Sequence, residues 1–98
     1  MDIIQRTFYL IDGKRDEFLH CMEDYYSAIE HDETVSTFAV LIPEDTESVV
    51  VVRFVLNEGA TWEQRMQLDY VQEFLGRVHS LIERVETSND KVLRFYSH

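Results

Sequence analysis

The chain has 98 residues, of which 45% are hydrophobic and 29% charged, a balance typical of one folded, soluble domain. Nineteen acidic residues against nine Lys and Arg give a formal net charge of −10. Such a charge disfavours contact with nucleic-acid phosphates and anionic membrane surfaces. We therefore expect a single domain over residues 1–98 that binds neither nucleic acid nor membrane.

The sequence carries no pattern for export, disulfide bonding or metal binding. No apolar stretch approaches the roughly 20 residues that span a bilayer, and the first residues lack the basic and apolar regions of a signal peptide. Cys21 is the only cysteine, and no His, Cys, Asp and Glu spacing is typical of a metal site. We expect a cytoplasmic protein without a metal or another cofactor.

The first third of the chain predicts a strand followed by a helix. Residues that favour β-structure cluster over 5–11, and Asp12-Gly13 ends the run. Over 14–30, apolar residues recur at helical spacing and form one face. That face holds Phe18, Met22, Tyr25 and Ile29. The acidic run over 30–33 is interpreted as the solvated end of this helix.

The middle of the chain predicts an antiparallel hairpin, with strands over 35–42 and 49–56 joined by the polar turn 43–48. Side chains alternate between the two faces of a strand, and both faces are apolar here. One face of the second strand holds Val49, Val51 and Val55, and the other holds Val50, Val52, Phe54 and Leu56. One layer of helices buries only one face, so the other face predicts a second subunit.

The last third predicts a bent helix and a final strand. Thr61 and Gln64 form a capping-box pattern that starts a short helix over 61–68, and Asp69 and Gln72 repeat that pattern. A longer helix is predicted over 70–86, a turn over 87–90 and a strand over 92–96. The apolar face of the longer helix holds Val71, Phe74, Leu75, Val78, Ile82 and Val85.

These elements give the order β-α-β-β-α-β, so the fold class is α+β with the ferredoxin-like arrangement. Two helices are expected to cover one face of a four-stranded antiparallel sheet. The other face is expected to meet a second copy of the chain, which makes the protein a homodimer.

Four segments in this order resemble the antibiotic-biosynthesis monooxygenase-like family of dimeric α+β barrels. They are the Gly-started helix with an acidic first turn over 12–18, the strand over 35–41, the turn over 43–45 and the bent helix over 62–78. The resemblance runs from about Ile4 to Tyr96. It implies a homodimer whose sheets face each other and a small-molecule pocket between the sheet and the helices of each subunit.

The resemblance also implies which chemistry to expect. Members that oxidise quinols or polyketides need no metal or flavin, because the substrate itself activates dioxygen, and they commonly carry a His where this chain has Tyr70. Haem-degrading members use an Asn on the first strand and a Trp and a His on the second helix. Arg65 and Leu75 stand at those helix positions here, so we expect no turnover of haem.

Two residues are candidates for catalysis. His79 lies at the edge of the apolar stripe, where an imidazole with a pKa near neutrality could act as general base toward a phenol. Tyr70 could donate a hydrogen bond that orients the substrate oxygen. The alternative for His79 is a partly exposed residue at the boundary of the core, without a catalytic role.

Other residues are candidates for binding a small aromatic or quinol-like ligand. Trp62, Phe74 and Tyr25 could supply flat walls, although aromatic residues at helical spacing are more often part of a core. The predicted strands also carry Arg6, Arg53 and Arg94. If they share a face they form a cationic patch, with Arg53 as a binding residue; otherwise they pair with the abundant carboxylates.

Two functions follow from these patterns. The first is a cofactor-independent monooxygenase that acts on a small aromatic or quinol-like molecule. The alternative is a noncatalytic homodimer that binds a ligand or has a purely structural role. A polar group that projects into an apolar pocket would favour the enzyme, and an interior filled with side chains would favour the alternative.

Overall fold

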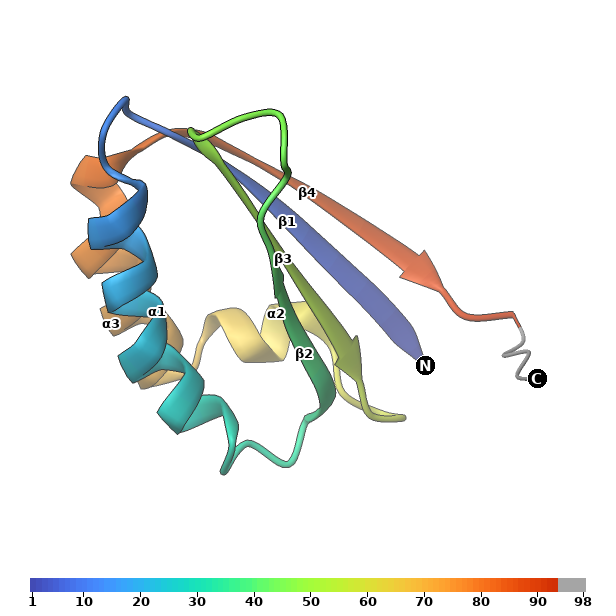
Figure 1. The fold of residues 1–98 in the computed structure, drawn as a ribbon. Helices are drawn as coiled ribbons and strands as arrows, with labels where there is room; N and C mark the ends of the chain where they lie inside the picture. The colour runs from blue at the N-terminus through green and yellow to red at the C-terminus, as the bar shows by residue number, and fades with distance from the viewer. Residues whose placement is uncertain (94–98) are drawn as a thin grey trace.

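The computed structural model describes residues 1–93. The elements are β1 (Asp2–Leu10), α1 (Arg15–Ile29), β2 (Val35–Leu41), β3 (Val49–Leu56), α2 (Trp62–Met66), α3 (Asp69–Val78), a 3-10 turn (His79–Leu81) and β4 (Ile82–Lys91) (Figure 1). The strands pair in the order β2-β3-β1-β4, and every pairing is antiparallel. The predicted ferredoxin-like α+β fold is therefore confirmed.

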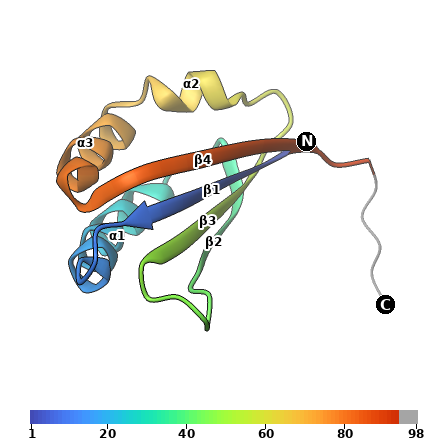
Figure 2. The same ribbon diagram turned by 90° about the horizontal axis from the view of Figure 1, so that it is seen from above.

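The helices cover one face of the sheet, where α1 and α3 pack side by side (Figures 1 and 2). The apolar stripe predicted for the first helix is buried on this face, and α1 lies within one residue of the predicted bounds at each end. The sheet contributes every second residue of β1 and β3 to the same core. These residues are Ile4, Phe8, Leu10, Val50, Val52, Phe54 and Leu56, all at most 2% exposed.

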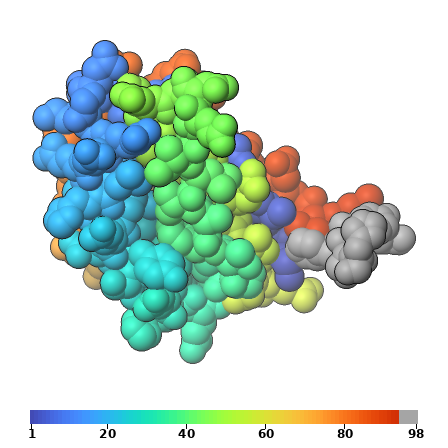
Figure 3. Space-filling model, viewed as in Figure 1, coloured from blue at the N-terminus to red at the C-terminus, as the bar shows by residue number. Residues whose placement is uncertain are grey.

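The opposite face of the sheet has no helix over it (Figure 2). Its apolar side chains come from the alternate positions of β1, β2 and β3. They are Ile3, Ala39, Leu41, Val49, Val51 and Val55. At the β2 edge of the sheet, α1 and β2 lie next to each other (Figure 3), and the rings of Tyr26 and Phe38 have centroids 5.9 Å apart. The two apolar faces of β3 are thus buried to different degrees, with Val50 and Val52 facing the helices.

The prediction of one helix over 70–86 is wrong in its second half. The helix α3 ends at Val78, and Ile82 and Val85 belong to β4. These two β-branched residues continue the helical spacing of the apolar stripe, but they also suit a strand. β4 pairs with almost the whole of β1. If residues 82–86 were helical, backbone N–H and C=O groups along that edge of β1 would lack hydrogen-bond partners.

The predicted turn over 87–90 is therefore also wrong, since these residues belong to the polar and exposed second half of β4. Exposed polar side chains are common on an edge strand, where they discourage pairing with other chains. The predicted strand over 92–96 begins after β4 has ended: Val92 and Leu93 lie outside any strand, and residues 94–96 lie outside the described residues.

Only the first of the two predicted caps is confirmed. The Thr61 side chain accepts a hydrogen bond from the backbone of Gln64, whose own side chain accepts one from the Thr61 backbone, and α2 begins there. Asp69 is not a cap, because Leu68 precedes the first turn of α3 and Asp69 lies within that turn. The carboxylate still complements the helix dipole there.

Of the helices described within residues 1–93, none is long and apolar enough to cross a membrane.

Candidate functional site

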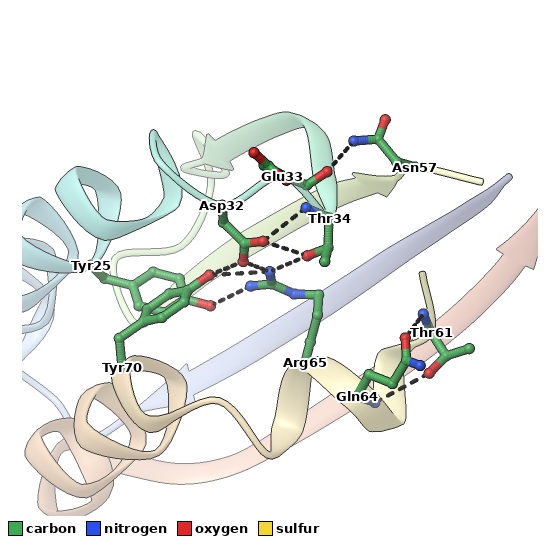
Figure 4. Close-up of polar contacts among 9 residues, drawn as sticks. All are labelled: Tyr25, Asp32, Glu33, Thr34, Asn57, Thr61, Gln64, Arg65 and Tyr70. Carbon is green, nitrogen blue, oxygen red and sulfur yellow. Dashed lines mark hydrogen bonds and ion pairs between the residues drawn. The ribbon is translucent and has the colours of Figure 1, made fainter. Parts of the chain in front are cut away.

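A buried arginine lies where α2, α1 and the segment before β2 meet. Arg65 is only 1% exposed, although arginine is rarely buried without partners. One terminal nitrogen donates to the Tyr25 hydroxyl at 3.1 Å, and the other donates to the Tyr70 hydroxyl at 3.1 Å (Figure 4). The guanidinium carbon also lies 4.9 Å from the centre of the Phe54 ring. Arg65 therefore ties α2 to α1, α3 and the sheet.

The counterion of Arg65 is Asp32, whose side chain is 6% exposed. Its carboxylate accepts hydrogen bonds from Arg65, from the Tyr70 hydroxyl and from Thr34 (Figure 4). The backbone nitrogen of Thr34 donates at 2.9 Å and its hydroxyl at 2.6 Å. Asp32 thus belongs to a buried network and not to a solvated helix end, which corrects the interpretation of the acidic run.

These contacts change how the network titrates. Burial alone would raise the pKa of Asp32, but hydrogen bonds from Thr34 and Tyr70 and the charge of Arg65 outweigh it and hold this pKa below its ordinary value. Burial and the hydrogen bond to Asp32 raise the pKa of Tyr70. The network therefore contains an ionised pair and neutral phenols at neutral pH.

The lowered pKa of Asp32 predicts a pH-dependent contribution to stability. This contribution is fully present above the pKa of an unfolded Asp, about 3.9, and is lost as the pH falls through the lower folded pKa. We expect Asp32→Asn to be less stable than wild type at pH 7 and the difference to shrink below about pH 4. Urea unfolding of both proteins at pH 7 and pH 3 measures this, and an unchanged difference would contradict it.

A small cavity lies between the sheet and the helices, next to the network. Its volume is about 10 Å³, room for about one water molecule. Its walls are apolar or aromatic except at Arg6 and Tyr25. The lining residues are Arg6, Phe8, Met22, Tyr25, Val52, Phe54, Trp62, Val71, Phe74 and Leu75.

Tyr25 belongs to both the cavity and the network. Its ring packs against Phe74 with centroids 4.3 Å apart, and its hydroxyl oxygen accepts a hydrogen bond from Arg65. Burial raises the pKa of Tyr25, although the charges of Arg65 and Arg6 oppose the shift. The hydroxyl therefore keeps its proton at neutral pH and can act as a hydrogen-bond donor.

The structure brings together three of the four residues predicted to bind a ligand. Trp62, Phe74 and Tyr25 line the cavity. Arg53 does not, because it lies on the opposite face of the sheet, where it donates to Gln5 at 2.8 Å. Since neighbouring strand positions face opposite ways, Arg6 and Arg53 cannot form one cationic patch, and Arg94 lies outside the described residues.

The two residues predicted to be catalytic lie apart from the cavity walls and from each other. The Tyr70 hydroxyl is engaged by Asp32 and Arg65 within the network. His79 is exposed after the last residue of α3, about 13 Å further along the helix axis. Neither residue lines the cavity. The positions of Tyr70 and His79 do not by themselves establish an activity, so both catalytic roles stay predictions.

Within residues 1–93, no group of three or more His, Cys, Asp or Glu comes together in a way that could hold a metal ion. The polar groups in and next to the cavity are instead two arginines, two tyrosines and one carboxylate, namely Arg6, Arg65, Tyr25, Tyr70 and Asp32. This set can orient and stabilise a ligand oxygen by hydrogen bonds and positive charge.

The sequence shows no family by itself: no family model matches the chain, and no curated protein is significantly similar to it. Solved structures do match. A candidate antibiotic biosynthesis monooxygenase from Deinococcus radiodurans aligns with a TM-score of 0.87 at 8% identity, over 100% of this chain and 98% of the other.

Two further structures carry the same description. The one from Nitrosomonas europaea has a TM-score of 0.86 at 10% identity and covers 96% of this chain and 100% of the other. The one from Caulobacter crescentus has a TM-score of 0.86 at 12% identity, over 95% and 90% of the two chains. The predicted resemblance is thereby confirmed at the level of the fold: this chain has the fold of the antibiotic biosynthesis monooxygenase-like proteins.

Proposed function

We propose that the protein is a cofactor-independent monooxygenase that acts on a small phenol or hydroquinone bound between the sheet and the helices. The observation that carries the proposal is a largely apolar, aromatic cavity whose lining also includes two residues with polar groups, Tyr25 and Arg6. Apolar sites with a few convergent polar groups are the usual binding sites of small molecules. The fold shared with candidate monooxygenases supports the same function.

In this mechanism the substrate supplies the electrons. A hydroquinone loses a hydroxyl proton to solvent, and the Tyr25 hydroxyl donates a hydrogen bond to the resulting phenolate oxygen. The electron-rich ring then reacts with dioxygen. One oxygen atom replaces a ring hydrogen and the other leaves as water, so that hydroquinone and dioxygen give hydroxyquinone and water. Phe74 and, once it has moved to admit the ring, Trp62 supply the flat aromatic surfaces against which the ring packs.

Oxygen uptake with a panel of hydroquinones and phenols tests this proposal. We expect uptake above the rate without protein, and a hydroxyquinone that carries one atom of labelled dioxygen. Uptake that yields only quinone and hydrogen peroxide would instead indicate a simple oxidase. No uptake with any member of the panel would overturn the proposed activity.

The small volume of the cavity favours a second candidate, a noncatalytic homodimer. Room for about one water means that side chains nearly fill the interior. Aromatic pairs such as Tyr25 and Phe74 then serve as core packing. Absence of both oxygen uptake and ligand binding would favour this candidate.

We further propose that either function is carried out by a homodimer joined through the sheet face that the helices leave open. This face bears Val51 and Val55 on β3 next to apolar residues of β1 and β2. Large apolar patches are rare on monomers and mark contact with another chain. A second copy of the same face would cover them.

Light scattering is expected to report about twice the chain mass of 11.7 kDa. The double variant Val51→Lys, Val55→Lys should scatter as a monomer, because two buried, unpaired charges oppose association. Thr46→Lys, in the loop between β2 and β3, adds one charge away from this face and should leave the dimer intact. A monomeric wild-type protein at micromolar concentration would disprove the dimer.

A further inference from the structure

We propose that Arg6 binds the carboxylate of an aromatic acid, so that the ligand of the cavity is a hydroxylated aromatic carboxylate. The inference rests on the function proposed above only in taking the cavity as the ligand site. It adds the substrate class, which the fold does not supply.

Arg6 forms no ion pair with any of residues 1–93. In the described part of the chain, Arg65, Arg77 and Arg84 form ion pairs, with Asp32, Asp24 and Glu86, whereas Arg6, Arg15 and Arg53 form none. Of these three unpaired arginines, only Arg6 lines the cavity. Arg6 has no carboxylate within 4.0 Å among residues 1–93, in a chain with nineteen acidic residues. A half-buried charge left unpaired inside such an acidic protein points to a partner from outside the chain.

The two terminal nitrogens of the Arg6 guanidinium are arranged so that they could bind a carboxylate. Its Nε donates to the Thr87 hydroxyl at 3.2 Å, which fixes the side chain against β4. Within residues 1–93 its two terminal nitrogens make no hydrogen bond. Two such nitrogens form the planar fork that binds both oxygens of a carboxylate.

The surroundings of Arg6 strengthen an interaction with an anion and suit an aromatic ring. The guanidinium lies 5.2 Å from the centre of the Trp62 ring and 5.3 Å from that of Phe8, so aromatic faces replace part of its water. Burial lowers the pKa of Arg6, but an arginine keeps its charge. Opposite charges attract more strongly where water is excluded.

Binding requires the cavity to open, and Trp62 is the residue that can open it. A cavity of roughly 150 Å³ holds a benzene ring, whereas the present volume is about 10 Å³. Trp62 is half-buried at the first position of α2, a helix of five residues. An entering ring displaces this side chain, so the only tryptophan of the protein reports on binding.

Titration with benzoate and with its neutral isostere benzamide tests the inference, with Trp62 fluorescence and calorimetry as readouts. We expect wild type to bind benzoate at least about tenfold more tightly than benzamide, the advantage of a charge-assisted pair. Arg6→Met should lose this preference, and Arg6→Lys should keep part of it. Arg77→Met, which removes an exposed arginine away from the cavity, should keep all of it.

Three results would overturn the inference: equal affinities for the two probes, a preference that survives in Arg6→Met, or no binding of either probe at millimolar concentration. If Arg6→Met fails to fold by circular dichroism, Arg6→Gln takes its place in the same comparison.

Oxygen uptake separates this inference from the proposed activity. Arg6-dependent binding of benzoate, without oxygen uptake from 2,5-dihydroxybenzoate or from any member of the hydroquinone and phenol panel, would refute the monooxygenase and leave the carboxylate site standing. Oxidation of unsubstituted hydroquinone without a preference for benzoate would refute only the carboxylate site.

Discussion

Replacing Arg65 by Met is expected to destabilise the protein by about 3–5 kcal/mol, the usual cost of breaking one side of a buried ion pair. Met fills much of the same space, so the loss is electrostatic more than steric. The variant leaves the Asp32 carboxylate 6% exposed and without its cation, and it removes the donors to Tyr25 and Tyr70. Unfolding in urea measures the free energy directly.

The matched control is Arg77→Met, which removes an arginine paired with Asp24 at 2.8 Å on the surface. Exposed pairs of this kind contribute about 0–1 kcal/mol, so this variant should unfold almost like wild type. Combining Arg65→Met with Asp32→Asn should recover part of the stability, because the buried charge is then removed as well. A loss below about 1 kcal/mol for Arg65→Met would show that the network contributes little.

The parts of the fold that local patterns encode could be predicted from the sequence. The stripe that includes Phe18 and Met22 has a strict helical period, and α1 begins and ends within one residue of the prediction. The strands of the hairpin are bounded by polar turns, and β2 and β3 form where expected. Periodicity within one segment suffices in these cases.

The boundary between α3 and β4 could not be predicted in the same way. Ile82 and Val85 fit the helical stripe and a strand equally well, so the sequence of this segment does not determine whether it forms a helix or a strand. Pairing with β1 favours the strand, because β4 pairs with β1 along nearly the full length of β1. Such long-range pairing leaves no trace in the spacing of one segment.

The buried network around Arg65 and Asp32 could not be predicted from the sequence for a similar reason. Asp32 stands in an acidic run that resembles a solvated helix end, and Arg65 stands on a short helix with polar neighbours. Only the fold brings these two residues together from positions 33 apart in the chain. The one available signal was the position of Arg65 within the bent helix, where the family resemblance implies a functional side chain.

The faces of the strands gave a clearer signal for Arg6. Alternation along β1 places Arg6 between the apolar residues Ile4 and Phe8, on the face that the helices bury. Alternation along β3 places Arg53 on the other face. Register between the strands, which the sequence does not state, is needed to see that only Arg6 reaches the cavity.

Tyr25→Phe is expected to lower turnover of a hydroquinone by about 10²-fold, the usual effect of removing one donor to an oxygen that becomes charged. Tyr25 lines the cavity and its hydroxyl keeps its proton, so under the proposed mechanism it donates to the phenolate as the negative charge develops. Phe preserves the packing against Phe74. The loss should therefore appear in kcat more than in KM.

The structural control for this variant is Tyr70→Phe. It also removes a hydroxyl that accepts a hydrogen bond from Arg65, but one that does not line the cavity. If Tyr25 acts on the substrate, Tyr25→Phe loses turnover and Tyr70→Phe retains most of it, at equal melting temperatures. The reverse result would support the role predicted for Tyr70 from the sequence. A loss of about 10²-fold or more in His79→Ala would likewise support a general base at His79, brought to the substrate by a rearrangement or by a second subunit.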